Sequence, residues 1–192
     1  TVDQIFNLAN VYRIITRGSK GALDRQLFRD DLYKRFHMTD EFLLDRNYNS
    51  INFIAVFRVF DKDNDAYVSL EEWIVGMSVL LLGTDAELVK FCFAVFNLTT
   101  DTSFGRDEMF QLLRTAITRF NTDEDPDEGV RDLIELVLRK MDHDQDGRIN
   151  FEDFEMSVKK DHLYLEIFGN CLPFPEYAEQ FLEQLSVVVD EY

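Results

Sequence analysis

Two short stretches of the sequence carry an acidic residue at every second position. These residues are Asp61, Asp63 and Asp65 in the first stretch and Asp142, Asp144 and Asp146 in the second. Carboxylate oxygens that alternate in this way along a flexible loop are ligands that a hard divalent cation such as calcium prefers. The same pattern also occurs in ordinary solvated turns, so the residues on either side have to distinguish a cation site from a turn.

Each stretch opens a twelve-residue loop that matches the ligand pattern of an EF-hand, in which positions 1, 3, 5, 7, 9 and 12 bind calcium and position 7 does so through its carbonyl. In loop 61–72 these positions hold Asp61, Asp63, Asp65, Tyr67, Ser69 and Glu72. In loop 142–153 they hold Asp142, Asp144, Asp146, Arg148, Asn150 and Asp153. The sequence therefore predicts two calcium sites.

Both loops depart from the preferred pattern at one position. Ala66 stands at position 6 of loop 61–72, where the turn requires a positive φ, and its Cβ costs on the order of 1 kcal/mol there. We expect this cost to weaken calcium binding without abolishing it. Asp153 is one methylene shorter than the usual Glu, which favours Mg²⁺ as a competitor in loop 142–153 because Mg²⁺ needs fewer ligands.

Two more segments have the same layout but have lost ligands. Segment 97–108 keeps Asp101 and Glu108 but has Asn97 and Thr99 at positions 1 and 3, so too little negative charge remains to offset dehydration of an ion. Segment 16–27 has no carboxylate in its first seven positions, and we expect it to bind no cation. We therefore treat both segments as degenerate loops.

The elements that must position these loops are helices. Apolar residues recur at fixed distances before and after all four segments, which is typical of an amphipathic helix on each side of a loop. The residues at position 8 of the four segments are Leu23, Val68, Phe104 and Ile149. We predict an all-α fold of four helix–loop–helix EF-hand units, followed by a C-terminal helix.

The spacing of the units divides the chain into two paired lobes and a tail. The predicted parts are residues 1–82, with segment 16–27 and loop 61–72; residues 83–170, with segment 97–108 and loop 142–153; and residues 171–192. An apolar stripe from Tyr177 to Val189 indicates that the tail helix either packs on the second lobe or contacts a partner, and packing is the simpler expectation.

Two insertions between the units are predicted to be surface loops. They cover residues 47–53 and 121–129. Within the second, Asp125 and Pro126 have the types expected at the N-cap and the first position of a helix.

Composition excludes several classes of function. The chain has 192 residues and a formal net charge of −17, which excludes a nucleic-acid binder driven by phosphate contacts and disfavours docking on an anionic membrane. Hydrophobic residues make up 46% of the chain and include 18 Phe, so the protein has enough apolar surface to fold. Two cysteines are too few for a disulfide framework and favour a reducing, intracellular compartment. Since no histidine cluster and no phosphate-binding loop is present, we predict that the protein is not an enzyme.

Six stretches carry a more specific resemblance. They are residues 23–28 (LDRQLF), 60–65 (FDKDND), 70–73 (LEEW), 124–129 (EDPDEG), 140–147 (KMDHDQDG) and 168–175 (FGNCLPFP). The last two are much more specific than the loops, which any EF-hand protein could share. Together they resemble the calaxin family, which are neuronal-calcium-sensor-like EF-hand proteins of motile cilia and flagella.

The resemblance implies a calcium-binding adaptor of the cytoplasm and the axoneme that couples calcium to ciliary beating. The implied partners are the coiled-coil proteins of the outer dynein arm docking complex, the dynein heavy chain and the doublet microtubule. The resemblance also implies that the twelve ligand positions given above for loops 61–72 and 142–153 are the calcium ligands. Two other interpretations remain open on the residues alone: a cytosolic calcium buffer, and a regulatory subunit of the calcineurin B type.

Overall fold

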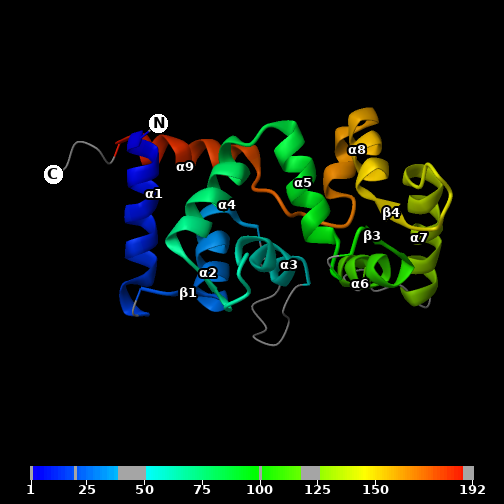
Figure 1. Cartoon of the computed structure of the whole chain (residues 1–192), viewed down its shortest axis with the longest axis horizontal. Coiled ribbons are helices and arrows are strands. Elements are labelled where there is room, and N and C mark those ends of the chain that lie inside the picture. Colours follow the sequence, from blue (N-terminus) through cyan, green and yellow to red (C-terminus); the bar gives the residue numbers. More distant parts are fainter. Residues whose placement is uncertain (1, 20, 39–50, 100, 118–125, 188–192) are drawn as a thin grey trace. The chain divides into compact units, whose positions relative to one another are not determined.

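The structure, a computed structural model, describes residues 2–19, 21–38, 51–99, 101–117 and 126–187. Within these residues the chain is built from helices joined by loops, and the only sheets are two short two-stranded ladders (Figure 1). The predicted all-α class is therefore confirmed. None of the described helices combines the length and the apolar character required to cross a bilayer.

Each predicted loop is flanked by a helix on both sides. The first pair of units consists of α1 (Val2–Ile15), η1 (Thr16–Gly18), β1 (Leu23–Asp24), α2 (Arg25–Phe36), α3 (Ile51–Phe60), β2 (Tyr67–Val68) and α4 (Leu70–Leu82). The second pair consists of α5 (Asp85–Phe96), β3 (Ser103–Phe104), α6 (Arg106–Ile117), α7 (Pro126–Met141), β4 (Ile149–Asn150) and α8 (Phe151–Lys160). The 3-10 helix η3 (His162–Glu166) and the helix α9 (Pro175–Val187) follow.

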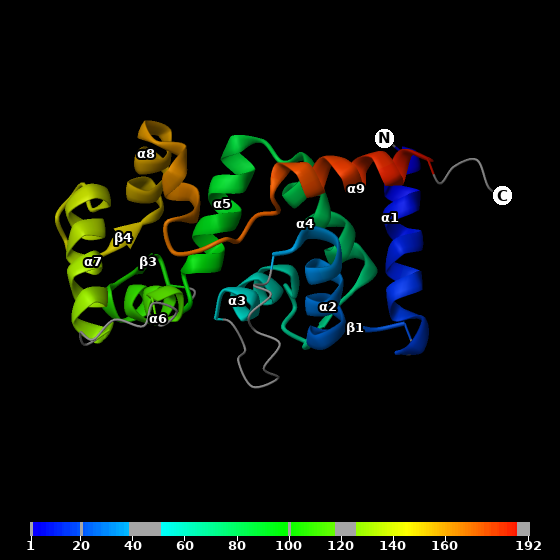
Figure 2. The same ribbon diagram turned by 180° about the vertical axis from the view of Figure 1, so that it is seen from behind.

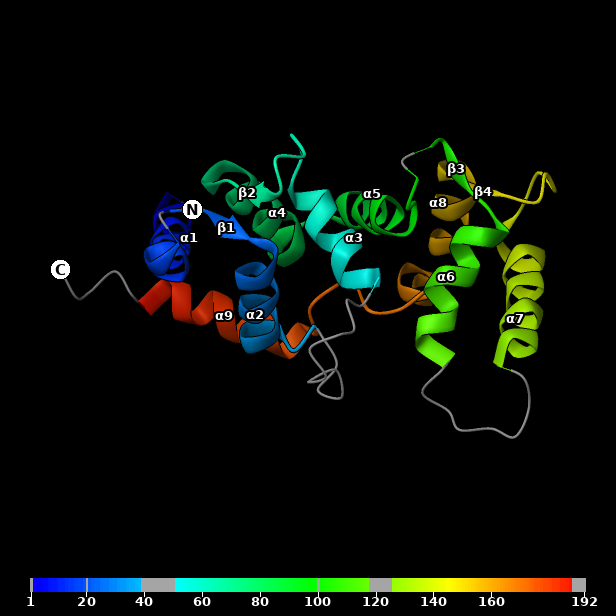
Figure 3. The same cartoon turned by 90° about the horizontal axis from the view of Figure 1, so that it is seen from below.

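The two ladders join the loops in pairs (Figure 3). Leu23 of β1 lies opposite Val68 of β2, and Phe104 of β3 lies opposite Ile149 of β4, both in antiparallel register. All four side chains are fully buried. These are the residues that the sequence placed at position 8, and they join the loops in the same two pairs that the predicted lobes contain.

The chain divides into two compact units. Unit 1 contains residues 1–49, 56–84 and 172–192, and unit 2 contains residues 50–55 and 85–171. In unit 1 the ring of Phe28 packs edge-on against Phe60 at 4.8 Å and against Trp73 at 6.2 Å between centroids. Trp73 is fully buried, so the residue that follows the closing position of loop 61–72 lies in the core.

Unit 2 has a phenylalanine core of its own. Phe168 packs against Phe96 at 5.2 Å and against Phe104 at 5.6 Å, so the first residue of the resembling stretch 168–175 lies in this core. Cys92 and Cys171 are free and completely buried, and their Sγ atoms are 3.2 Å apart. Both therefore act as small core residues.

The helix α9 packs within unit 1, where it contacts α1, α2 and α4 (Figures 1 and 2). The ring of Phe181 lies 5.1 Å from Phe36, and the amide of Asn7 donates a hydrogen bond to the carbonyl of Leu185. The expectation that this helix packs on the second lobe was therefore wrong. Its apolar stripe indicated that it needs a partner, but a stripe does not specify which surface covers it.

The two predicted surface loops are partly helical. The helix α3 begins at Ile51 and buries Phe53, so residues 51–53 are not a surface loop. The helix α7 begins at Pro126, as predicted from the proline, and residues 126–129 form its first turn. Residues 47–50 and 121–125 lie outside the described part of the chain.

Candidate metal centres

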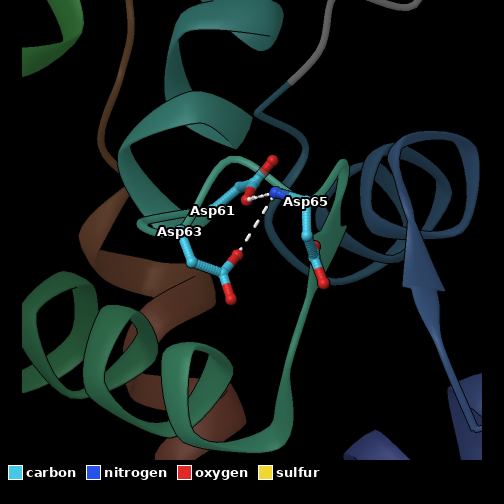
Figure 4. A group of neighbouring side chains, drawn as sticks. All are labelled: Asp61, Asp63 and Asp65. Atoms are coloured by element: carbon cyan, nitrogen blue, oxygen red, sulfur yellow. Dashed lines mark hydrogen bonds between the residues drawn. The ribbon is translucent and has the colours of Figure 1, made fainter.

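Loop 61–72 brings three carboxylates close together, and two of them accept from one backbone amide (Figure 4). Asp61, Asp63 and Asp65 each offer an oxygen, and these oxygens all lie within 4.8 Å of one another. The amide of Asp65 donates to Oδ1 of Asp61 at 3.1 Å and to Oδ1 of Asp63 at 3.2 Å. The loop therefore holds its predicted ligands close together through its own hydrogen bonds.

The backbone of this loop turns through two residues with positive φ. Asn64 has φ 58° and Ala66 has φ 71°, and the amide of Ala66 donates to Oδ2 of Asp61 at 3.1 Å. Asparagine tolerates this region, whereas the Cβ of alanine is strained there by roughly 1 kcal/mol. The conformation at Ala66 is the one that the sequence predicted to be costly.

The closing residue Glu72 ties the two ends of the loop together. Its Oε1 accepts a 2.7 Å hydrogen bond from the amide of Lys62, and its Oε2 accepts bonds of 2.8 Å from the amide and from the hydroxyl of Ser69. Ser69 in turn caps α4, completing a capping box. Burial acts to raise the pKa of Glu72, but these hydrogen bonds outweigh it and lower the pKa, so Glu72 is held as a carboxylate.

Asp61 lies in a different electrostatic environment. Burial raises its pKa, amides of Ala66 and Asp65 lower it, and the charges of Asp65 and Glu72 raise it again; the net shift is upward. The ionised carboxylates of this loop therefore repel one another. A divalent cation bound among them would relieve this repulsion.

Loop 142–153 repeats the same geometry. The predicted ligand oxygens of Asp142, Asp144 and Asp146 also lie within 4.8 Å of one another. The amide of Asp146 donates to Asp142 and to Asp144, both at 3.2 Å. The turn has Gln145 at φ 61° and Gly147 at φ 82°, so here the residue at position 6 is one that adopts a positive φ without strain.

The shorter closing residue of this loop reaches the same two backbone positions as Glu72. Oδ1 of Asp153 accepts a 3.0 Å bond from the amide of His143, and Oδ2 accepts a 3.2 Å bond from the amide of Asn150. Asn150 caps α8 and, like Ser69, forms a capping box with the closing residue. Arg148 donates its amide to Asp146 at 2.7 Å. Both predicted loops thus share one hydrogen-bonding scheme.

The two degenerate loops are built differently. Within the described residues, neither contains a cluster of three acidic side chains. In segment 97–108, Thr102 at position 6 is not among the described residues with positive φ, so its backbone does not follow the turn of the other two loops. In segment 16–27, Asp24 serves as the N-cap of α2 and accepts from the amide of Leu27 at 2.9 Å.

Two residues near the loops have roles that the sequence did not indicate. Tyr12 is one of the residues that recur at a fixed distance before the four segments, and its hydroxyl reaches the backbone of loop 61–72. Arg148 was counted only for its carbonyl, yet its side chain extends to Ser103 in segment 97–108. Spacing along a chain does not show where a long polar side chain ends, so no signal in the sequence pointed to either contact.

Comparison with known proteins agrees with this architecture. A family model described as an EF-hand domain pair matches residues 52–158. Calaxin of Bos taurus is 45% identical over 171 residues, which cover 89% of this chain and 76% of that protein. Calaxin of Danio rerio is 46% identical over 163 residues, covering 85% of this chain and 73% of that protein. Calaxin of Xenopus laevis is 44% identical over 155 residues, covering 81% and 70%.

These matches include both loops in which the acidic side chains converge and extend over most of the chain. The helix–loop–helix pairs, the two ladders and the two preformed carboxylate clusters are the parts that a calcium-binding EF-hand protein requires. This chain is therefore a calcium-binding EF-hand protein and belongs to the calaxin family.

Proposed function

We propose that this chain is a calcium-responsive adaptor of motile cilia and flagella that regulates beating and has no catalytic activity of its own. In this proposal it associates with the outer dynein arm on the doublet microtubule, through the coiled-coil proteins of the docking complex and the dynein heavy chain. Its relatedness to calaxins supports the assignment of the family. The observation that carries the calcium response is the direct link between loop 61–72 and the core of unit 1.

That link runs through two consecutive residues. Glu72 closes the loop, and Trp73 is the next residue, in the first turn of α4, where its side chain is fully buried against Phe28. A calcium ion held by the loop carboxylates would attract Glu72 away from the amide of Lys62. Because Glu72 lies in the first turn of α4, this movement would tilt the helix and change the packing of Trp73.

The consequence for partner binding is a helix-in-groove mechanism. Tilting α4 away from its neighbours uncovers apolar residues of unit 1, and an amphipathic helix of a docking-complex protein can then bind to them. Loop 142–153 has complete oxygen ligands but the shorter Asp153, and we propose that Mg²⁺ competes with calcium there.

The calcium response can be tested by fluorescence, because the chain contains one tryptophan. Calcium added to the full chain in millimolar Mg²⁺ should change the emission of Trp73, and Glu72→Gln should abolish the change. Glu71→Gln is the matched control: Glu71 is the preceding residue in the same first turn of α4 but is not at a ligand position. An equal response in the two variants would contradict the sensor mechanism.

The ciliary assignment needs a separate experiment. The tagged full chain should co-purify with outer-arm dynein and docking-complex proteins from an axonemal extract, and Glu72→Gln should change the calcium dependence of this binding. Recovery of none of these proteins, with or without calcium, would contradict the proposed partners while leaving calcium binding itself in place. A calcium buffer would bind the ion without a fluorescence change and without capturing these partners.

A further inference from the structure

The side chain of Arg148 extends from loop 142–153 into segment 97–108 within unit 2. Its Nε donates to Oγ of Ser103 at 2.7 Å, and its Nη2 donates to the carbonyl of the same residue at 2.7 Å. Nη2 also lies 3.8 Å from Oε2 of Glu108. The guanidinium is therefore fixed at two points on β3 and forms an ion pair with the residue at position 12 of the degenerate loop.

Glu108 occupies the position that supplies the closing carboxylate in a calcium loop, and it is only 7% exposed. Its Oε1 accepts a 2.9 Å bond from the hydroxyl of Thr99, and its Oε2 accepts a 2.9 Å bond from the amide of Gly105. A carboxylate this deeply buried requires a positive partner as well as hydrogen bonds. Arg148 is the cation that forms an ion pair with it in the described part of the chain.

In the described part of the chain, the other two closing residues have no such cationic partner. Glu72 and Asp153 accept hydrogen bonds from backbone amides, and in the residues that the structure describes no lysine or arginine forms an ion pair with either of them. Their negative charge remains available to an added ion. The loop that has lost ligands is thus the one whose closing carboxylate has an ion-pair partner in the described part of the chain.

Gly105 makes room for this arrangement. A Cβ built on Gly105 would lie 3.1 Å from Nη1 of Arg148, closer than ordinary van der Waals contact. Gly105 stands at position 9, where loops 61–72 and 142–153 carry the ligands Ser69 and Asn150. Because Gly105 has no side chain, position 9 supplies no ligand to an ion, and the space that a side chain would fill is left for the guanidinium of Arg148.

We propose that the guanidinium of Arg148 is a built-in cation for segment 97–108, which neutralises Glu108 and keeps this loop closed without a metal ion. Arg148 then serves both loops of unit 2. Its side chain holds segment 97–108, while its backbone carbonyl is the predicted ligand at position 7 of loop 142–153. One residue accordingly links the metal-free loop to the metal-binding one. This inference concerns the lobe itself and does not depend on the ciliary partners.

The test is a double-mutant cycle on the full chain in EDTA, with urea unfolding as the measurement. Arg148→Met should lower the urea midpoint of unit 2 by about 0.5 M because it leaves Glu108 buried without its cation. Glu108→Gln should then cost much less in the Arg148→Met background than in the wild type. Additive effects of the two substitutions would overturn the proposal.

Two controls separate the specific pair from a general loss of charge. Arg106 forms an exposed ion pair with Glu135 at 2.9 Å in the same unit, so Arg106→Met and Glu108→Gln should be additive. If Arg148→Met does not fold, Arg148→Lys replaces it; it keeps a positive charge without the planar fork and should retain part of the coupling with Glu108. If Arg148→Lys and Glu108→Gln show no coupling, the result would contradict the proposal that Arg148 serves as a built-in cation.

A second measurement addresses the metal directly. Equilibrium dialysis with calcium should give the same number of bound ions for the wild type and for Glu108→Gln, because segment 97–108 uses no metal. Loss of one bound ion in Glu108→Gln would overturn the proposal. Should the wild type bind no calcium at all, the proposed sensor function fails, but the unfolding cycle in EDTA still decides the role of Arg148.

Discussion

The hydroxyl of Tyr12 donates a 2.9 Å hydrogen bond to the carbonyl oxygen of Val68. Tyr12 lies on α1, in the unit with the degenerate segment 16–27, and Val68 is position 8 of loop 61–72. The two residues are 56 positions apart in the chain, and both are buried. The helix α1, which precedes the degenerate segment 16–27, therefore supports the backbone of loop 61–72 through Tyr12.

Replacing this tyrosine should affect both stability and calcium affinity. Tyr12→Phe leaves the Val68 carbonyl without its side-chain donor, and we expect unit 1 to lose about 1 kcal/mol of unfolding free energy. Calcium affinity at loop 61–72 should fall because β2 is held less firmly. Urea unfolding and calorimetric titration check the two effects. Tyr67→Phe, whose phenol is exposed, is the control, and equal behaviour of both variants would contradict this role.

Position 6 is alanine in loop 61–72 and glycine in loop 142–153, so the two residues can be exchanged in opposite directions. Ala66→Gly removes a strained Cβ at φ 71°, and calcium affinity at loop 61–72 should increase roughly fivefold for about 1 kcal/mol of strain. Gly147→Ala should weaken loop 142–153 by a similar amount, because it places a Cβ at φ 82°. The nearest atom to this Cβ would be Nη1 of the exposed Arg106 at 3.0 Å, and that side chain can move. Calorimetric titration measures both. An unchanged affinity of Ala66→Gly would show that calcium binding adds no strain at Ala66.

Asp31 should make unit 1 less stable as the pH rises. Burial raises its pKa above the ordinary value of 3.8, and Arg35 offsets this only in part. The native state then binds the proton more tightly than the unfolded chain, so the stability contributed by the neutral form is present below pH 3.8 and is lost as the pH rises through the folded pKa.

Asp31→Asn isolates this effect because the amide stays neutral. The stability of the variant relative to the wild type should increase as the pH rises from about 4 to 7, measured by urea unfolding in EDTA. Asp30→Asn is the control, since Asp30 is exposed and pairs with Arg29 on the surface. If the difference in unfolding free energy between Asp31→Asn and the wild type stays constant with pH, the assigned shift in the pKa of Asp31 is wrong.

Phe181 tests the position of α9. Its ring packs on Phe36 and lies 5.2 Å below the guanidinium of Arg35, and its side chain is 3% exposed. Phe181→Ala should therefore destabilise unit 1 by about 3 kcal/mol or more. The unfolding of unit 1 is followed by Trp73 fluorescence. If the transition of Trp73 is unchanged while unit 2 unfolds earlier, α9 does not belong to unit 1.

The sequence predicted well those features that depend on local spacing. Counting twelve-residue loops located the two carboxylate clusters and identified the position-8 residues Leu23, Val68, Phe104 and Ile149, which the structure then pairs across two ladders. These features can be found by counting residues along the chain, because residues at a given spacing in a loop or a helix lie at fixed separations. The strained φ of Ala66 was predictable for the same reason.

Features that depend on distant contacts were not predictable in this way. The amphipathic pattern of α9 indicated that one face must be covered, but only the folded chain shows that Phe36 and Asn7 cover it. The side chain of Arg148 crosses 45 positions of sequence to reach Ser103. Its direction is set by the packing of β3 beside β4, which no single loop encodes.

The placement of α9 also bears on how this protein is made. A ribosome releases the segments of unit 1 first, yet α9, which closes that unit over Phe36, follows all of unit 2 in the chain. During synthesis, unit 1 therefore has part of its apolar surface uncovered until α9 emerges. Unit 2 is complete before that point and can already fold. We expect this interval, rather than the finished molecule, to be the stage at which the protein most needs a chaperone.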